Sequence, residues 1–478
     1  MQSIEILEVN MNYESLIPLY ILEEKKQKIL QQYDQIDEKS VNQEFIEIYV
    51  EMIESDDIVK QHFGLLAIRR LISINQNPNS FEITQAIIES SIVPKLMQIV
   101  DLQSNQLFLF EALWILTNIA SGTNQQTQVI VKNGAIPILL KHLNSKHYNI
   151  LEQVFWAIGN IAADEDGDFR NIIIQQGGLF KIVQISEKLM KENRSQLVKL
   201  CSWTLRNLSR GNPNQYIDKY KRQIINLFTY IINKFDDQET LFDAYWGLYY
   251  ISNSKNGLDS IQEIINTGII DRFIQLLKSN CTVQIIALDL RIIKKILGGS
   301  QSQKEYVLNK NIIDNFAHLL TKLELKSIRR EICQCLSNII AGNQSQIKRL
   351  INNDQILKSL ESIFIFENVE TQIEIAFIFS NALKYINQND ILRLVDYGVL
   401  QIFGRTLGLQ TASSQQKIEI LNSSDFILKN VSSLKEEPKK FIMEQLPIFQ
   451  IQNDDKADEK LINCKEEYFI KWQRFIEN

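Results

Sequence analysis

Four of the five tryptophans share one spacing and one set of neighbours, at intervals of 42, 47 and 43 residues by difference of their numbers: Trp114, Trp156, Trp203 and Trp246. An asparagine follows four places after each of the first three, at Asn118, Asn160 and Asn207. Indole faces attract cations and pack against the stems of Lys and Arg, each contact contributing about 0.5–2 kcal/mol. A side-chain amide both donates and accepts, so a series of Asn can hold the backbone of an extended peptide whatever its sequence.

The residues around Trp114 predict the element that positions this pair. Wound as a helix, the stretch 111–127 (EALWILTNIASGTNQQT) places Ala112, Leu116 and Ile119 on one stripe. Trp114 and Asn118 lie one turn apart on a different face. The sequence therefore predicts a helix that buries one face and presents an aromatic and an amide on another.

The pattern repeats as FWAIGNIAADEDG, SWTLRNLSRGNPN and AYWGLYYISNSKNG. A period near 42 residues predicts one all-α solenoid whose core grows by stacking. Breaks at 134–137, 177–179, 268–270 and 397–399 each precede an apolar helix, and the Trp-bearing helix follows. We expect an acidic, partly helical N-terminal segment at 1–58, with helices around 16–33 and 44–53, then the solenoid at 59–432. A charged tail should follow at 433–478, with a final helix at 461–475.

Composition and motifs exclude several classes of function. The net charge of −6 disfavours direct nucleic-acid binding and suits a basic peptide partner. The five cysteines show no even-spaced disulfide framework, so we interpret them as reduced thiols. We expect no signal peptide, membrane span, metal site, cofactor or nucleophile constellation, so the sequence indicates a binding protein and no enzyme.

From about Val59 to Leu407 the chain resembles importin α, the armadillo-repeat adaptor that binds nuclear localisation signals. The segments EALWILTNIASGT, FWAIGNIAAD, SWTLRNLSRGNP and DAYWGLYYIS carry the resemblance, including Tyr250 in place of Asn. It implies a right-handed superhelix of about nine to ten three-helix repeats, whose third helices line a concave groove. It also implies location in cytoplasm and nucleus.

The resemblance implies a major signal site, in which a carboxylate selects a cation by a charge-assisted hydrogen bond. Its residues would be Trp114, Asn118, Gly122, Thr127, Trp156, Asn160, Asp164, Trp203, Asn207, Asp243 and Trp246. From the residues alone, the asparagines could instead stitch neighbouring helices, and Asp164 could belong to a solvated acidic loop.

The family's minor signal site departs from its pattern in this sequence. The matching positions are Arg291, Gln334, Asn338, Glu374, Phe377 and Asn381, so that Gln334 and Phe377 stand where the family has Trp. Lys295 stands at an Asn position and would repel a basic peptide. We therefore expect a minor site that is weak or repurposed, and a preference for monopartite basic signals.

Importin α normally begins with a basic segment that binds importin β, whereas residues 1–58 hold 14 acidic residues. We expect an importin-α-like protein without that segment, whose use of importin β stays open. The leading hypothesis is a nuclear import adaptor for basic signal peptides. The alternative is an armadillo scaffold that binds basic segments without transport.

Overall fold

The computed structural model describes residues 43–73, 80–103, 105–165, 167–211, 217–253, 257–322, 326–431 and 459–477. Over these ranges the secondary structure is helical and contains no strand. The chain divides into two compact units, Met1–Leu227 (unit 1) and Phe228–Asn478 (unit 2), and each is described by itself.

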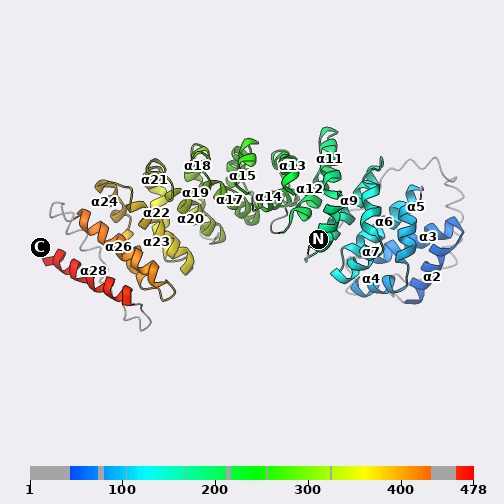
Figure 1. Cartoon of the computed structure of the whole chain (residues 1–478), viewed down its shortest axis with the longest axis horizontal. Helices are drawn as coiled ribbons and strands as arrows, with labels where there is room; N and C mark the ends of the chain where they lie inside the picture. Colours follow the sequence, from blue (N-terminus) through cyan, green and yellow to red (C-terminus); the bar gives the residue numbers. More distant parts are fainter. Residues whose placement is uncertain are drawn as a thin grey trace. The chain divides into compact units, whose positions relative to one another are not determined.

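Unit 1 is a succession of short helices (Figure 1). They are α2 (Gln43–Glu54), α3 (Ile58–Ile72), α4 (Ser80–Glu89), α5 (Val93–Leu102), α6 (Gln106–Ala120), α7 (Asn124–Lys132), α8 (Ala135–His142), α9 (Tyr148–Ala162), α10 (Asp168–Gln175), α11 (Gly178–Lys191), α12 (Ser195–Ser209) and the 3-10 helix η1 (Ile217–Lys219). Helix α13 (Lys221–Lys234) crosses the boundary between the two units.

Unit 2 continues the same alternation of short and longer helices (Figure 1). They are α14 (Gln238–Ser252), α15 (Gly257–Asn266), α16 (Ile270–Leu277), α17 (Val283–Leu297), α18 (Gln301–Leu308), α19 (Ile312–Leu320), α20 (Lys326–Ile340), α21 (Gln344–Ile351), α22 (Asp354–Phe364), α23 (Val369–Leu383), α24 (Gln388–Asp396), α25 (Val399–Leu407), α26 (Ser414–Val431) and α28 (Glu459–Glu477).

A glycine with positive φ marks the corner before several second helices of the repeats. The φ values are 86° at Gly134, 83° at Gly177, 74° at Gly268 and 75° at Gly398. Only glycine adopts this left-handed conformation without a steric cost. The breaks predicted before α8, α11, α16 and α25 are therefore confirmed.

The third helix of each repeat is the element that carries the Trp and Asn positions, and α6 shows how it is held. Ala112, Leu116 and Ile119 are at most 1% exposed, which confirms the predicted core stripe. Leu113 and Ile115 are also fully buried, because α3 and α9 pack against α6 on either side. The helix is thus apolar over most of its circumference, and Trp114 and Asn118 stay on its partly exposed face.

Helices are present near both predicted ends of the repeat array. The helix expected at 44–53 is α2, which packs on α3, and the final helix expected at 461–475 is α28, which packs on α26. Leu461 and Tyr468 of α28 are buried in that contact. The helix expected at 16–33 and the stretch 432–458 lie outside the described residues.

The described ranges bear on two further features, membrane spans and metal sites. None of their helices is long and apolar enough to cross a membrane. Nor do their His, Cys, Asp and Glu side chains gather into a group able to hold a metal ion.

Candidate functional site

The first three Trp–Asn pairs lie on α6, α9 and α12 of unit 1, helices that pack side by side in chain order. Trp156 is the most exposed of the indoles, at 38%, and Trp114 and Trp203 are half-buried. Each pair is spaced by one helical turn, so its two side chains point from one face. We call this set of residues the unit 1 ladder, and each Trp–Asn pair is one of its rungs.

Two rings of the unit 1 ladder touch each other. The centroids of Trp156 and Trp203 are 4.9 Å apart and their planes are inclined by 51°. The two rings therefore form a tilted contact, which has no room for an aliphatic stem between them. A basic side chain would have to pack on the outer faces of this pair or separate the rings.

Gly159 allows the Trp203 ring to lie against α9. A Cβ atom built on Gly159 would be 1.9 Å from Cζ3 of Trp203, well inside any real contact. Gly159 lies three places after Trp156, on the same face as the ladder. The sequence reasoning missed this position, although a glycine within an otherwise strong helix signals a close approach.

The side chains of Asn160 and Asn207 form hydrogen bonds to the preceding repeat. The amide nitrogen of Asn160 donates to the carbonyl of Thr117 at 3.1 Å, and that of Asn207 donates to the carbonyl of Gly159 at 3.1 Å. In both cases the acceptor is the residue three places after the preceding tryptophan. An amide group has two N–H donors and an acceptor oxygen, so this bond leaves Asn160 able to hold a peptide as well.

Asn118 departs from that rule. Its amide nitrogen donates to the carbonyl of Trp114 in its own helix at 3.0 Å and approaches Oγ of Ser73 in α3 at 3.5 Å. Asn118 remains half-buried.

The third rung of the ladder is covered by a cation of the chain itself. Asn207 is only 3% exposed, and its oxygen accepts hydrogen bonds from Nε and Nη2 of Arg206 at 3.2 and 3.0 Å. A peptide can reach this amide only if Arg206 moves.

Asp164 lies in the loop after α9, one turn beyond Asn160. Its Oδ2 accepts the backbone N–H of Gly167 at 3.1 Å. Its Oδ1 is buried and has no hydrogen-bond partner among the described residues. A carboxylate oxygen left in this state loses hydration without compensation, so a donor from a ligand would be favourable there.

Arg170 of α10 fixes this loop from behind, and is itself 5% exposed. Its Nη2 donates to the carbonyl of Asp164, its Nε to that of Ala162 at 3.0 Å, and its Nη1 to that of Arg210 at 2.7 Å. Arg170 therefore ties together the ends of α9 and α12. It is a positioning residue that the sequence reasoning missed, since it comes from α10 and not from a helix that carries a Trp–Asn pair.

The first rung also contacts a cation of the chain. The guanidinium of Arg69 lies 4.7 Å from the centroid of the Trp114 ring, and Arg69 forms an ion pair with Glu111. Burial raises the pKa of Glu111 above its usual value, against the lowering effect of Arg69. One face of Trp114 is thus already used by an arginine.

Gly122 and Thr127 have structural roles at the start of α7. A Cβ on Gly122 would meet the side chain of Gln126, which closes a capping box with Thr123. The same glycine-and-glutamine arrangement recurs before α18 and α21. Thr127 is 5% exposed, and its hydroxyl donates to the carbonyls of Ala120 and Thr123.

In unit 2, Asp243 and Trp246 lie on α14 and both are half-buried. The Trp246 ring stacks on Tyr250, with centroids 5.1 Å apart and planes inclined by 30°, and meets Phe242 and Tyr249 edge-on. Tyr250 therefore fills the space over the indole that an asparagine would leave open.

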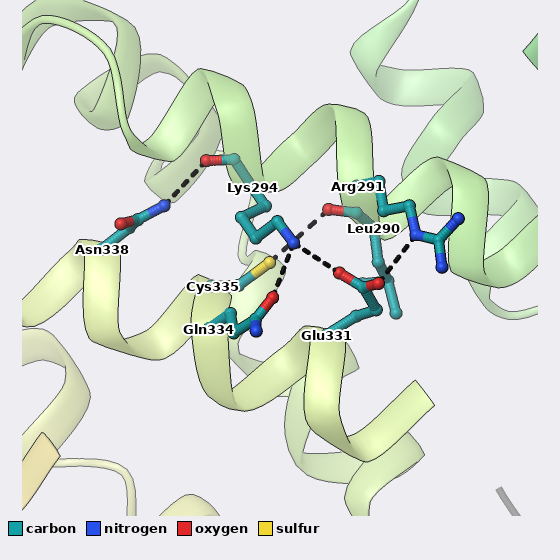
Figure 2. A network of polar contacts seen from close by, with 7 residues as sticks. All are labelled: Leu290, Arg291, Lys294, Glu331, Gln334, Cys335 and Asn338. Carbon is teal, nitrogen blue, oxygen red and sulfur yellow. Dashed lines mark hydrogen bonds and ion pairs between the residues drawn. The ribbon is translucent and has the colours of Figure 1, made fainter. Parts of the chain in front are cut away.

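Figure 2 shows the region of the predicted minor site on α17 and α20, and its polar groups bond to one another. Glu331 accepts from Nε of Arg291 and from Nζ of Lys294, both at 2.7 Å. Lys294 also donates to Oε1 of Gln334 at 2.6 Å, and Asn338 donates to the carbonyl of Lys294 at 2.9 Å. We call these five residues the α17–α20 network.

The remaining minor-site positions lie on α23 and are half-buried: Glu374, Phe377 and Asn381. The side-chain oxygen of Asn381 accepts a hydrogen bond from Lys384 at 2.9 Å. At this Asn position of unit 2 a lysine of the chain therefore engages the amide oxygen, as Arg206 does at Asn207 of unit 1.

Comparison with known proteins bears on these repeats. The armadillo/β-catenin-like repeat family matches residues 80–121 and 123–163, which are α4–α6 and α7–α9. By its fold the chain is similar to an engineered protein of known crystal structure, with a TM-score of 0.71 and 20% identity over 92% of this chain and all of that one.

Curated relatives share sequence over about half of the chain. Importin subunit alpha-1b of Oryza sativa subsp. japonica is 32% identical over 259 residues, 54% of this chain and 46% of that protein. Importin subunit alpha-2 of Arabidopsis thaliana is 33% identical over 224 residues, 47% of this chain and 40% of that protein. The chain matches less than half the length of these relatives. Together with its armadillo repeats, this makes the chain similar to importin α proteins over about half of its length.

Proposed function

We propose that the protein is a nuclear import adaptor that binds a basic, monopartite signal peptide on the unit 1 ladder and acts between cytoplasm and nucleus. Its similarity to importin α proteins supports the role of an adaptor, and the ladder supports the chemistry of the ligand. Binding of the signal by fit and charge, without turnover, is the expected activity.

One observation carries this proposal: a buried carboxylate oxygen, without a hydrogen-bond partner among the described residues, lies one turn after a half-buried amide and two turns after an exposed indole. Trp156 and Asn160 lie on α9, and Asp164 lies just past its end. A lysine ammonium donates up to three hydrogen bonds and neutralises the carboxylate. A charge-assisted hydrogen bond of this kind contributes about 1.5–3 kcal/mol.

The neighbouring rungs limit the length of the basic peptide segment that the ladder can bind. Arg69 lies over Trp114, and Arg206 covers Asn207, so both flanks of the Asp164 rung hold a cation of the chain. Like charges repel, which disfavours a long basic run across all three rungs. We propose that the site reads a short basic core centred on one lysine at Asp164.

The test is a titration of a fluorescent Lys-rich peptide against the wild type and Trp156→Ala/Asp164→Ala at near-physiological salt, where the Debye length is about 8 Å. We expect binding at roughly micromolar affinity or tighter in the wild type, and its loss in the double variant. The matched control is Phe469→Ala/Glu466→Ala, which removes an exposed aromatic and an exposed carboxylate from α28. Equal loss in both double variants would contradict the proposed site.

Transport is tested separately from recognition. The full chain, loaded with the peptide, is incubated with purified importin β and analysed by size-exclusion chromatography. A complex containing all three components would support the adaptor function through this carrier. Peptide binding without capture of importin β would contradict the adaptor function through that carrier and favour the scaffold alternative.

A further inference from the structure

Helix α17 of unit 2 carries three cations where the other third helices carry ladder residues. Arg291 stands at the Trp position, Lys295 at the Asn position four places later, and Lys294 between them. All three are partly exposed. The α17–α20 network in Figure 2 contains one carboxylate, that of Glu331, against the two cations that contact it.

The internal hydrogen bonds of this network engage the side-chain oxygens of Glu331 and Gln334. Oε1 of Glu331 accepts from Arg291 and Oε2 accepts from Lys294, so both carboxylate oxygens are engaged. The side-chain oxygen of Gln334 is engaged by Lys294 as well. Glu331 is buried, with a side chain only 12% exposed, and is poorly placed to meet a further ligand.

The groups that remain on Arg291, Gln334 and Lys295 are donors. Among the described residues, Nη1 and Nη2 of Arg291, Nε2 of Gln334 and Nζ of Lys295 have no hydrogen-bond partner. Figure 2 shows the outer end of the Arg291 guanidinium directed away from Glu331. A surface that offers only donors suits an acceptor-only group, and an ionised carboxylate is the protein group of that kind.

Lys295 gains most from such a partner. Its Nζ lies 5.9 Å from the centroid of the Tyr249 ring of α14, and it is only partly hydrated. Burial lowers the pKa of Lys295, and neighbouring Lys294 lowers it further, while Tyr249 raises it. A carboxylate beside Nζ would offset both the lost hydration and the repulsion between the two lysines.

The spacing of the cations fits a peptide. Arg291 and Lys295 are one turn apart, with Cβ atoms about 5–6 Å apart. In an extended peptide, side chains two residues apart share a face and are about 6.6 Å apart. Acidic residues at alternate positions of an extended segment would therefore face the two cations at the same time.

We propose that the α17 surface formed by Arg291, Lys295 and Gln334 binds an extended acidic peptide segment of a partner protein, with carboxylates at alternate residues. Arg291 takes one carboxylate through its two outer nitrogens, and Lys295 takes the next. The site is independent of Asp164, so the chain has two peptide surfaces that prefer opposite charges.

The test uses a fluorescent peptide of alternating Glu and Gly and its Gln–Gly counterpart, titrated against the full chain at near-physiological salt. We expect the Glu peptide to bind at least about tenfold more tightly than the Gln peptide, since each charge-assisted bond contributes about 1.5–3 kcal/mol. Arg291→Gln/Lys295→Gln should abolish that preference. Equal affinity of both peptides for the wild type overturns the proposal.

Two controls separate this site from general electrostatics and from misfolding. Lys278→Gln/Lys358→Gln removes the same charge from exposed positions of unit 2, and is expected to leave the preference unchanged. Arg291→Lys/Lys295→Arg keeps both charges and is expected to retain it. Asp164→Asn should also retain it, which distinguishes this site from the basic-peptide site. A similar loss in the exposed control pair overturns the proposal.

Discussion

Each unit contains an arginine that pairs with a glutamate three places before the Trp position of the next third helix. In unit 1, Arg69 pairs with Glu111 and its guanidinium lies over the Trp114 ring. In unit 2, Arg291 pairs with Glu331, but Gln334 stands where an indole would lie. The two regions thus share the ion pair and differ in the residue beside it.

That one difference changes which polar groups the region leaves without a hydrogen bond. With an indole present, the arginine stacks on its face, and the next rung keeps an exposed ring and an unpartnered carboxylate oxygen. With Gln334 in its place, Lys294 bonds both Gln334 and Glu331. The side-chain oxygens of Glu331 and Gln334 are thus engaged within the protein, and the groups left over on Arg291 and Gln334 are donors.

The largest expected effect of a single change concerns Asp164. Asp164→Asn keeps the size of the side chain but removes its charge, so affinity for a Lys-rich peptide should fall about 10–100-fold, which corresponds to about 1.5–3 kcal/mol. Fluorescence anisotropy measures it. The matched variant is Glu331→Gln in unit 2, which is expected to leave the affinity for this peptide nearly unchanged. A larger loss of affinity in Glu331→Gln than in Asp164→Asn would contradict the comparison.

The second prediction concerns a buried carboxyl of α17. Asp289 is 1% exposed, and the equivalent places two residues before the Trp position are apolar in α6, α9 and α14: Ala112, Val154 and Ala244. Burial raises the pKa of Asp289 well above its usual value. The folded chain then binds more protons than the unfolded chain, so stability falls as the pH rises above the unfolded-state pKa.

Asp289→Asn should therefore stabilise the protein at pH 7, by about 1–3 kcal/mol. The advantage should narrow towards pH 5, by at most about 1.4 kcal/mol per pH unit. Urea denaturation at both pH values measures it. Val154→Asn, the matched change in α9, should destabilise unit 1, because it buries an amide at an apolar place. A less stable Asp289→Asn at pH 7 would contradict the role assigned to this carboxyl.

A third and smaller effect is expected at the covered rung of unit 1. Arg206→Ser frees the oxygen of Asn207 and removes a cation from the ladder, so a Lys-rich peptide should bind about 2–10-fold more tightly. Calorimetric titration measures the gain. Arg194→Ser removes the same charge from an exposed position of unit 1, and an equal gain in that variant would show that Arg206 acts only through net charge.

The smallest effect is expected from Lys294→Ala. It opens the α17–α20 network, yet affinity for the basic peptide should change by less than about fivefold, because partly exposed charges contribute about 1 kcal/mol or less. Competition with the fluorescent peptide measures it. A large gain would mean that the network, and no feature of Asp164, limits binding of basic peptides.

Much of the fold could be predicted because each repeat contains its own local signals. The core stripe of α6 and the glycine corners at Gly134 and Gly177 follow from helical periodicity and backbone sterics. The face that carries Trp114 and Asn118 follows from the same periodicity. These features depend on residues within one helix or one turn.

Contacts between repeats could not be predicted in the same way. The bond from Asn160 to the carbonyl of Thr117 spans 43 residues, and the bonds of Arg170 join an outer helix to the loop of Asp164. The cover of Arg206 over Asn207 depends on a rotamer. Asp289 is the exception, because an acidic residue within the apolar run VQIIALDL indicates a buried carboxyl from the sequence alone.

The most direct test of the contrast between the units is to locate the bound basic peptide. A Lys-rich peptide with a photoreactive residue beside its central lysine is crosslinked to the full chain and mapped by mass spectrometry. The predicted result is crosslinks on α9 and the loop that carries Asp164, lost on competition with unlabelled basic peptide. Competable crosslinks on α17 and α20 would contradict it.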